Sequence, residues 1–255
     1  MSEEGLTIEP GRNGKPKKKG FREIFAGSVA IKNQYFGDNR DLFKYDLIMH
    51  VVKVGLVKQF VFIPMLTGPD DALHGKAADR SRAKAGIKNR ALVAFLDKCI
   101  SEGKRDIEQL KGFFNQQDIE MKIYGAEEYF SRERRREYFA QIGDELLSES
   151  LVFVDPDNGL EVRRSGEKHL LYDEIGELYR RMGEGSILML CQNFPRRPRQ
   201  EYLNTRCTEI KEKITGDWPV CIDDDRIAFF FLTANESMEH SLTHVIGDYA
   251  EQYSG

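Results

Sequence analysis

Apolar residues along the chain fall into short continuous runs separated by longer periodic segments. Runs of this kind that end at turn-forming residues predict strands buried on both faces. They occupy residues 59–66, 151–154 and 186–192, and a shorter run at 120–124 predicts a further strand. Near the C-terminal end, residues 219–222 and 226–233 flank a short acidic turn and predict a β-hairpin.

Segments with apolar residues at helical spacing lie between these runs. Asp38 or Asn39 is expected to cap the first helix, and Ser131 is expected to cap a later one. The predicted helices cover residues 39–52, 89–99, 106–115, 132–147, 172–181 and 201–214, with a last one after residue 236. Strands that alternate with helices predict an α/β protein. We therefore expect a Rossmann-like three-layer sandwich with a mostly parallel sheet that ends in an antiparallel hairpin.

Composition divides the chain into three parts. Residues 1–20 contain four glycines and a run of lysines at 15–19, too little apolar surface to form a core, and predict a flexible basic arm. Such an arm would hold a phosphate backbone without reading its sequence, or would be a solvated tail. Residues 21–235 are expected to form the Rossmann-like domain, and residues 236–255 a C-terminal tail or helix.

Overall charge and cysteine content narrow the class of protein. The chain has 255 residues, 40% of them hydrophobic, and a formal net charge of −4, which suits one large domain. No apolar run has the length of a membrane span, so we expect no membrane partner. The four cysteines lack C-x-x-C spacing, which argues against a zinc site and favours a reduced, cytoplasmic protein. Cys191 and Cys221 lie in apolar runs and are expected in the core.

An acidic turn follows the predicted strand at 151–154. Residues 155–161 (DPDNGLE) place three carboxylates, Asp155, Asp157 and Glu161, around a proline and a glycine. Pro156 fixes its own φ angle, and Asn158-Gly159 is a pair that favours a turn. In open α/β sheets, ligands bind beyond the carboxyl ends of the strands, where this turn would lie. The turn is therefore the first candidate for a functional site, and an acidic surface turn is the alternative.

Two sequence motifs resemble a known family. The α/β order with a terminal hairpin resembles the Rossmann-like fold of class I methyltransferases, which use S-adenosylmethionine. Residues 37–45 (GDNRDLFKY) resemble the Gly-Asn-x-x-Asp-x-x-Lys-His signature of the large-subunit ribosomal RNA adenine-N6 methyltransferases. Gly37, Asp41 and Lys44 match it, whereas Asp38 replaces Asn and Tyr45 replaces His.

The acidic turn carries the second motif. The same family has Asp-Pro-Pro-Tyr-Glu after its fourth strand, where this chain has residues 155–161. The aromatic residue of that motif is absent here, and the loop after residues 59–66 keeps Gly68 but is followed by Pro69. The run DPDNGLE also resembles uncharacterised bacterial and phage proteins. The resemblance extends over residues 34–234.

The resemblance implies methylation of the N6 amino group of adenine in a nucleic acid. The catalytic group would be Asp155, Pro156, Asp157 and Glu161, with Asp155 and the Pro156 carbonyl accepting hydrogen bonds from that amino group. The cofactor S-adenosylmethionine would be bordered by Gly37, Asp38, Asp41, Lys44, Thr67, Gly68 and Asp70. A nucleic-acid substrate would contact Phe194, as a stacking face, together with Arg196, Arg197, Lys168 and His169.

Two other functions use the same residues differently. Carboxylates of Asp70, Asp155, Asp157 and Glu161 would suit Mg²⁺ or Mn²⁺, and a metal beside Lys44 or Lys168 would activate water against a phosphodiester. That reading predicts a divalent-metal-dependent nuclease or phosphodiesterase. A third possibility is a non-catalytic module that binds nucleic acid or protein through the basic arm and the Arg-rich turn at 196–199.

Overall fold

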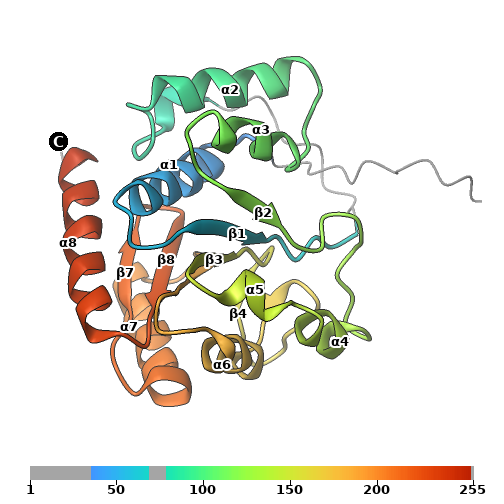
Figure 1. The fold of residues 1–255 in the computed structure, drawn as a ribbon, viewed down its shortest axis with the longest axis vertical. Coiled ribbons are helices and arrows are strands. Elements are labelled where there is room, and N and C mark those ends of the chain that lie inside the picture. The colour runs from blue at the N-terminus through green and yellow to red at the C-terminus, as the bar shows by residue number, and fades with distance from the viewer. Residues whose placement is uncertain (1–35, 69–78, 254–255) are drawn as a thin grey trace, which may run out of the picture.

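A six-stranded sheet lies between two layers of helices in the computed structural model, which describes residues 36–68 and 79–253 (Figure 1). The strands follow the order β2-β1-β3-β6-β8-β7, and the first four are parallel. Strand β8 runs antiparallel between β6 and β7. The strands are β1 (Gln59–Ile63), β2 (Met121–Ile123), β3 (Ser150–Val154), β6 (Ile187–Asn193), β7 (Val220–Asp223) and β8 (Ile227–Leu232). The predicted Rossmann-like α/β sandwich with an antiparallel hairpin is confirmed.

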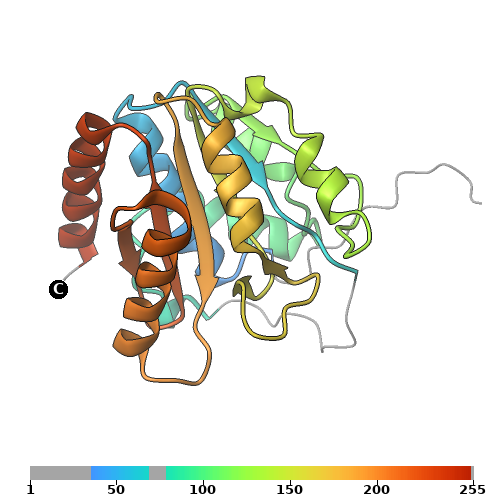
Figure 2. The ribbon, with the colours of Figure 1, turned by 90° about the horizontal axis from the view of Figure 1, so that it is seen from below.

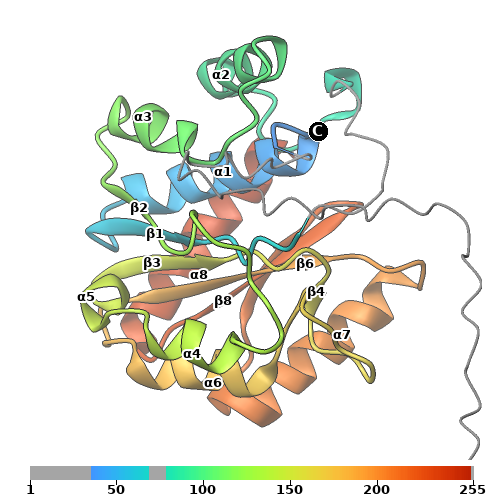
Figure 3. The ribbon, with the colours of Figure 1, turned by 90° about the vertical axis from the view of Figure 1, so that its right-hand side faces the viewer.

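Helices cover both faces of the sheet, as Figure 3 shows with the sheet between two layers. The first core contains residues from α1, α2, α3 and α8, and the second contains residues from α4, α5, α6 and α7. The helices are α1 (Asn39–Lys53), α2 (Arg90–Ser101), α3 (Gln109–Asn115), α4 (Arg135–Ala140), α5 (Asp144–Leu147), α6 (Tyr172–Arg181), α7 (Arg199–Ile210) and α8 (Glu236–Tyr253). A π-helical turn, Lys211–Thr215, continues α7.

Alternation along each central strand explains why the sheet has two hydrophobic faces. In β3, Leu151 and Phe153 belong to the first core, whereas Val152 and Val154 belong to the second. All five residues of β3 are buried, as expected for a parallel strand with helices on both sides. A continuous apolar run, rather than an alternating one, is the sequence pattern of such a strand.

Two predicted elements differ from those in the structure, and one small sheet was not predicted. The strand predicted over residues 59–66 ends at Ile63, because Pro64 follows. The helix predicted over residues 132–147 is two short helices, α4 and α5, separated at Gly143, and Ser131 is not the N-cap of α4. A two-stranded parallel sheet was not predicted from the sequence, and it consists of β4 (Gly159–Leu160) and β5 (His169–Leu170). Figure 2 shows it beside the carboxyl end of β6.

The C-terminal segment is joined to the first helix through a buried carboxylate. Asp46 of α1 accepts hydrogen bonds from the hydroxyls of Tyr249 and Tyr253 in α8, at 2.9 and 2.7 Å. It also accepts one from Asn89, the N-cap of α2, at 2.8 Å. Leu242 of α8 is fully buried in the first core. Helix α8 is therefore packed against the domain that precedes it. Within the described residues, no helix has the length and hydrophobicity needed to cross a membrane.

We predict that Asp46→Ala lowers the free energy of unfolding by about 2–3 kcal/mol, because it leaves the buried Tyr249 hydroxyl without its charged acceptor. Urea denaturation measures the change. Asp248→Ala, on an exposed position of α8, is the control and should change stability by less than about 0.5 kcal/mol. Equal losses in the two variants would show that the network does not hold α8.

Candidate functional site

The candidate site lies where the strand order reverses direction. From β1 the chain moves to β2 on one side and then to β3 on the other, so the carboxyl ends of β1 and β3 bound the switch point. Ligands of open α/β sheets bind in the crevice at such a point. Residues 64–68 leave β1 here, and the acidic turn 155–161 leaves β3.

Helix α1 supplies a lysine to the acidic turn. The Lys44 Nζ atom lies 2.6 Å from Oδ2 of Asp155 and 3.2 Å from Oδ1 of Asp41. We call these three side chains the Lys44 cluster. They are only 10–17% exposed, which makes this a nearly buried arrangement of one ammonium and two carboxylates. The two sequence motifs, 111 positions apart, therefore meet in space.

The start of α1 explains how the cluster is positioned. The Asp38 carboxylate caps the helix by accepting from the backbone N–H groups of Arg40 and Asp41, at 2.7 and 3.0 Å. Gly37 adopts a φ of +88°, which favours glycine, and its N–H donates to the Asp41 carboxylate at 2.8 Å. Asp41 and Lys44 are three positions apart in α1 and thus share a face. Each residue of the first motif that matches the family has a structural role here.

Burial and charge shift the pKa values within the cluster. Burial raises the pKa of Asp41 to about 6, assisted by Asp38 and Asp155 and opposed by Lys44. Burial alone would lower the pKa of Lys44, but Asp155 and Asp41 hold it well above its ordinary value. Cys191 of β6 also faces Asp155, and burial together with that carboxylate raises the pKa of its thiol. Lys44 is therefore a permanent cation at neutral pH.

Polar side chains from β6 hold the acidic turn in place. Asn193 donates to the Asp157 carbonyl at 2.9 Å and accepts from Arg40 at 3.1 Å. Gln192 accepts from the Leu160 N–H at 2.9 Å. Gly159 has a φ of +109°, and a Cβ atom there would lie 2.3 Å from the Gln192 side chain. Only glycine fits this position without displacing Gln192.

Asp157 and Glu161 have other partners than the Lys44 cluster. Asp157 accepts a hydrogen bond from Thr67, and its carboxylate lies 4.0 Å from Nζ of Lys168. Burial raises the pKa of Asp157. The Glu161 carboxylate accepts from the Tyr172 N–H at 2.9 Å, at the start of α6. The structure thus joins Asp157 to the loop after β1, whereas Glu161 supports α6.

The predicted substrate residues lie on the turn after β6 and at β5. Arg196 and Arg197 are exposed on the turn after β6. Phe194 is half-buried, with its ring against Tyr202 and the Arg199 guanidinium. His169 accepts from the Gly166 N–H at 3.3 Å, and burial and then Arg135 lower the pKa of its imidazole. Asp70, the basic arm at 1–20 and Pro69 lie outside the described residues.

Two residues that shape the site, Asn193 and Arg80, were not predicted from the sequence. Asn193 could have been predicted, because a polar residue at the carboxyl end of a parallel strand is a functional candidate. Arg80 could not have been predicted, because it lies far from both motifs in the sequence. Its guanidinium donates to the carbonyls of Gly37 and Asp38, at 2.9 and 3.2 Å, and pairs with Asp97 of α2.

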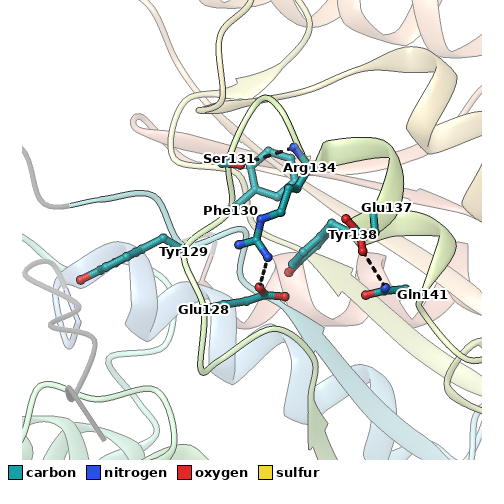
Figure 4. A pocket seen from close by; sticks show the side chains of 8 residues that line it. All are labelled: Glu128, Tyr129, Phe130, Ser131, Arg134, Glu137, Tyr138 and Gln141. Atoms are coloured by element: carbon teal, nitrogen blue, oxygen red, sulfur yellow. Dashed lines mark hydrogen bonds and ion pairs between the residues drawn. The ribbon is translucent and has the colours of Figure 1, made fainter. Parts of the chain in front are cut away.

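A separate small pocket lies between the segment after β2 and α4 (Figure 4). An ion pair between Arg134 and Glu128, at 2.9 Å, crosses it. None of its lining residues belongs to the Lys44 cluster. Phe130 connects it to the loop after β1 by donating to the Leu66 carbonyl at 2.6 Å.

Comparison with known proteins adds no family to this geometry. No protein-family model matches the chain, and no curated protein matches its sequence.

We predict that Lys44→Met lowers stability by about 3–5 kcal/mol at pH 8, since it leaves two carboxylates in a largely dry site without their cation. The loss should shrink at pH 5. In the folded protein Asp41 titrates near pH 6, against an ordinary value of 3.8, so stability falls as the pH rises through this interval. Removing Lys44 raises the pKa of Asp41 further and extends that fall to higher pH.

Chemical denaturation at the two pH values checks this prediction. Lys58→Met, which breaks an exposed pair with Glu149, is the matched control and should change stability by less than about 1 kcal/mol. Adding Asp155→Asn to Lys44→Met should recover part of the loss, because the two residues interact directly. Strict additivity of the two substitutions would contradict the proposed coupling.

Proposed function

We propose that this protein is a methyltransferase-like enzyme that transfers a methyl group from S-adenosylmethionine to the N6 amino group of adenine in a nucleic acid. The observation that carries the proposal is the 2.6 Å contact between Lys44 and Asp155. Each residue is the matching position of one of two motifs that resemble the adenine-N6 methyltransferases. Their meeting at the carboxyl edge of a Rossmann-like sheet supports a common site.

The backbone after β1 supports the same location. Met65 is fully buried and has a φ of +42°, which is uncommon for a residue with a side chain. Such strained positions concentrate at ligand-binding and active sites. The strain therefore favours a functional loop at this edge of the switch point rather than a simple connection.

The residues around the crevice have the chemistry that the cofactor requires. S-adenosylmethionine carries an ammonium and a carboxylate on its methionine part, and hydroxyls on its ribose. Asp41 and Lys44 offer both signs of charge, and Thr67 and Gly68 offer a hydroxyl and an open backbone. When bound, the cofactor would supply an activated methyl group on its sulfonium.

Asp155 would bind and orient the amino group that receives the methyl. Its carboxylate has acceptor sites beyond the one that Lys44 uses. The Pro156 carbonyl, which comes next in the chain, would accept the second hydrogen of the same nitrogen. Two acceptors directed at one amine orient its lone pair toward the cofactor. Lys44 would act as a positioning residue that fixes Asp155.

The nucleic-acid substrate would approach over the turn after β6. Arg196 and Arg197 are exposed and would neutralise phosphates. Lys168, which precedes β5, and His169, in β5, would contact the same nucleic-acid strand from the other side of the acidic turn. Phe194 would provide a face for the target base, which requires that Arg199 move off its ring.

The metal-dependent alternative competes for the same carboxylates. In the Lys44 cluster an ammonium already occupies the space next to Asp155, where a divalent cation would have to bind. Glu161 is engaged at the start of α6. These contacts favour methyl transfer over phosphodiester hydrolysis.

We predict that Asp155→Asn lowers methyl transfer by at least about 100-fold, because the amide cannot replace the charged acceptor in this orientation. The assay follows incorporation of labelled methyl groups from S-adenosylmethionine into adenine-containing single-stranded RNA and DNA oligonucleotides. Asp173→Asn, on an exposed position of α6, is the control and should retain full activity. Circular dichroism verifies that both variants fold.

Two results would contradict the proposed function. One is equal methyl transfer by the wild-type protein and Asp155→Asn. The other is divalent-metal-dependent cleavage of the same oligonucleotides by the wild-type protein, with loss of cleavage in Asp155→Asn and no methyl incorporation.

A further inference from the structure

Two cysteines from different elements meet on the second face of the sheet. Cys207 of α7 and Cys221 of β7 lie within hydrogen-bonding contact of each other. Both are free thiols, and the remaining two cysteines, Cys99 and Cys191, are buried. Cys221 was expected in the core because it lies in an apolar run, but it is exposed.

The alternation of β7 accounts for this contact. Val220 and Ile222 pack against the first core, so Cys221 between them projects to the opposite face. Cys207 packs against the second core on that face. An ion pair between Arg199 of α7 and Asp223 of β7 fixes the same helix to the same strand. The two pairs show that α7 and β7 run in opposite directions, with Arg199 near Asp223 and Cys207 near Cys221.

Access and acidity both favour reaction at Cys221. Among the described residues, strand β7 is at the edge of the sheet and pairs only with β8. The hydrogen bond that Cys207 donates lowers the pKa of Cys221 to about 7, while burial and the Asp223 charge oppose this shift. A thiolate that is exposed and next to a second thiol has the arrangement of a cysteine that oxidises reversibly.

We propose that Cys207 and Cys221 form an oxidation site that closes to an intramolecular disulfide in the presence of a peroxide. The Cys221 thiolate attacks one oxygen of hydrogen peroxide, breaks the O–O bond and becomes a sulfenic acid, with hydroxide as the leaving group. The Cys207 thiol then attacks the Cys221 sulfur, the S–O bond breaks, and the leaving hydroxide takes up the Cys207 proton to form water. The two thiols lose two electrons, and one peroxide becomes two water molecules.

Closure would join α7 to the edge of the sheet. The two sulfur atoms must move from contact to a bond length of about 2.05 Å, within the reach of side-chain rotation and a small shift of the edge strand. The enclosed segment contains the π-helical turn Lys211–Thr215 and Gly216, which has a φ of +79°. The bond would restrict this turn, and added thiol reductant would release it.

Peptide mapping of the folded wild-type protein tests the proposal. The protein is treated with hydrogen peroxide, free thiols are alkylated, and the digest is analysed by mass spectrometry before and after reduction with dithiothreitol. We expect one linked peptide pair, Cys207 with Cys221, that disappears on reduction, while Cys99 and Cys191 stay unmodified until the protein is denatured. The oxidised form should also melt at a higher temperature than the reduced form.

Single serine variants separate this proposal from a purely structural thiol contact. In Cys207→Ser the linked peptide is lost and peroxide leaves Cys221 as sulfenic or sulfinic acid, which shows that Cys221 reacts first. In Cys221→Ser, Cys207 should stay reduced. The proposal is overturned if the wild-type protein accumulates Cys221 sulfinic acid while Cys207 remains a free thiol, or if neither cysteine reacts.

Discussion

The nearly buried ammonium of Lys44 is the constraint around which the site is built. Two carboxylates, Asp41 and Asp155, lie against it in a region where an unpaired charge would be costly. One of them comes from the same helix and the other from the end of the central strand β3. The ion pairs therefore fix α1 against the carboxyl edge of the sheet. The N-cap at Asp38, the left-handed Gly37 and the contact of Arg40 with Asn193 all serve this placement.

The fold brings the segments that leave β1 and β3 together beside this cluster. At the switch point the chain continues from β1 to β2 on one side, and β3 lies on the other side of β1. The loops that leave β1 and β3 are joined by the hydrogen bond from Thr67 to Asp157. The acidic turn is rigid because Gln192 and Asn193 of the next strand hold its backbone. A rigid turn with a fixed carboxylate is suited to orienting a small polar group, and flexible carboxylates would be better suited to wrapping a metal ion.

Local patterns in the sequence predicted much of this architecture and part of the site. Leu151–Val154 is a continuous apolar run that Pro156 follows, and Asp38 precedes a helical pattern, so β3 and α1 were both predictable. The break at Gly143 was not predictable, because the charged run before it has no apolar residues at helical spacing. Strands of two residues, such as β4, are too short to leave a pattern. The partner of Glu161, the Tyr172 N–H, is set by tertiary packing and could not be predicted from the sequence.

Isothermal titration of the protein with S-adenosylmethionine, repeated with Mg²⁺ and Mn²⁺ in its place, tests the proposed methyl transfer most directly. We expect one cofactor site with a dissociation constant on the order of micromolar, equivalent to about 8 kcal/mol of binding free energy. Binding should weaken when Thr67 is replaced by valine, which removes the hydroxyl and keeps the shape. The proposed methyl transfer would be contradicted if S-adenosylmethionine gave no heat and the protein bound a metal ion that Asp155→Asn no longer binds.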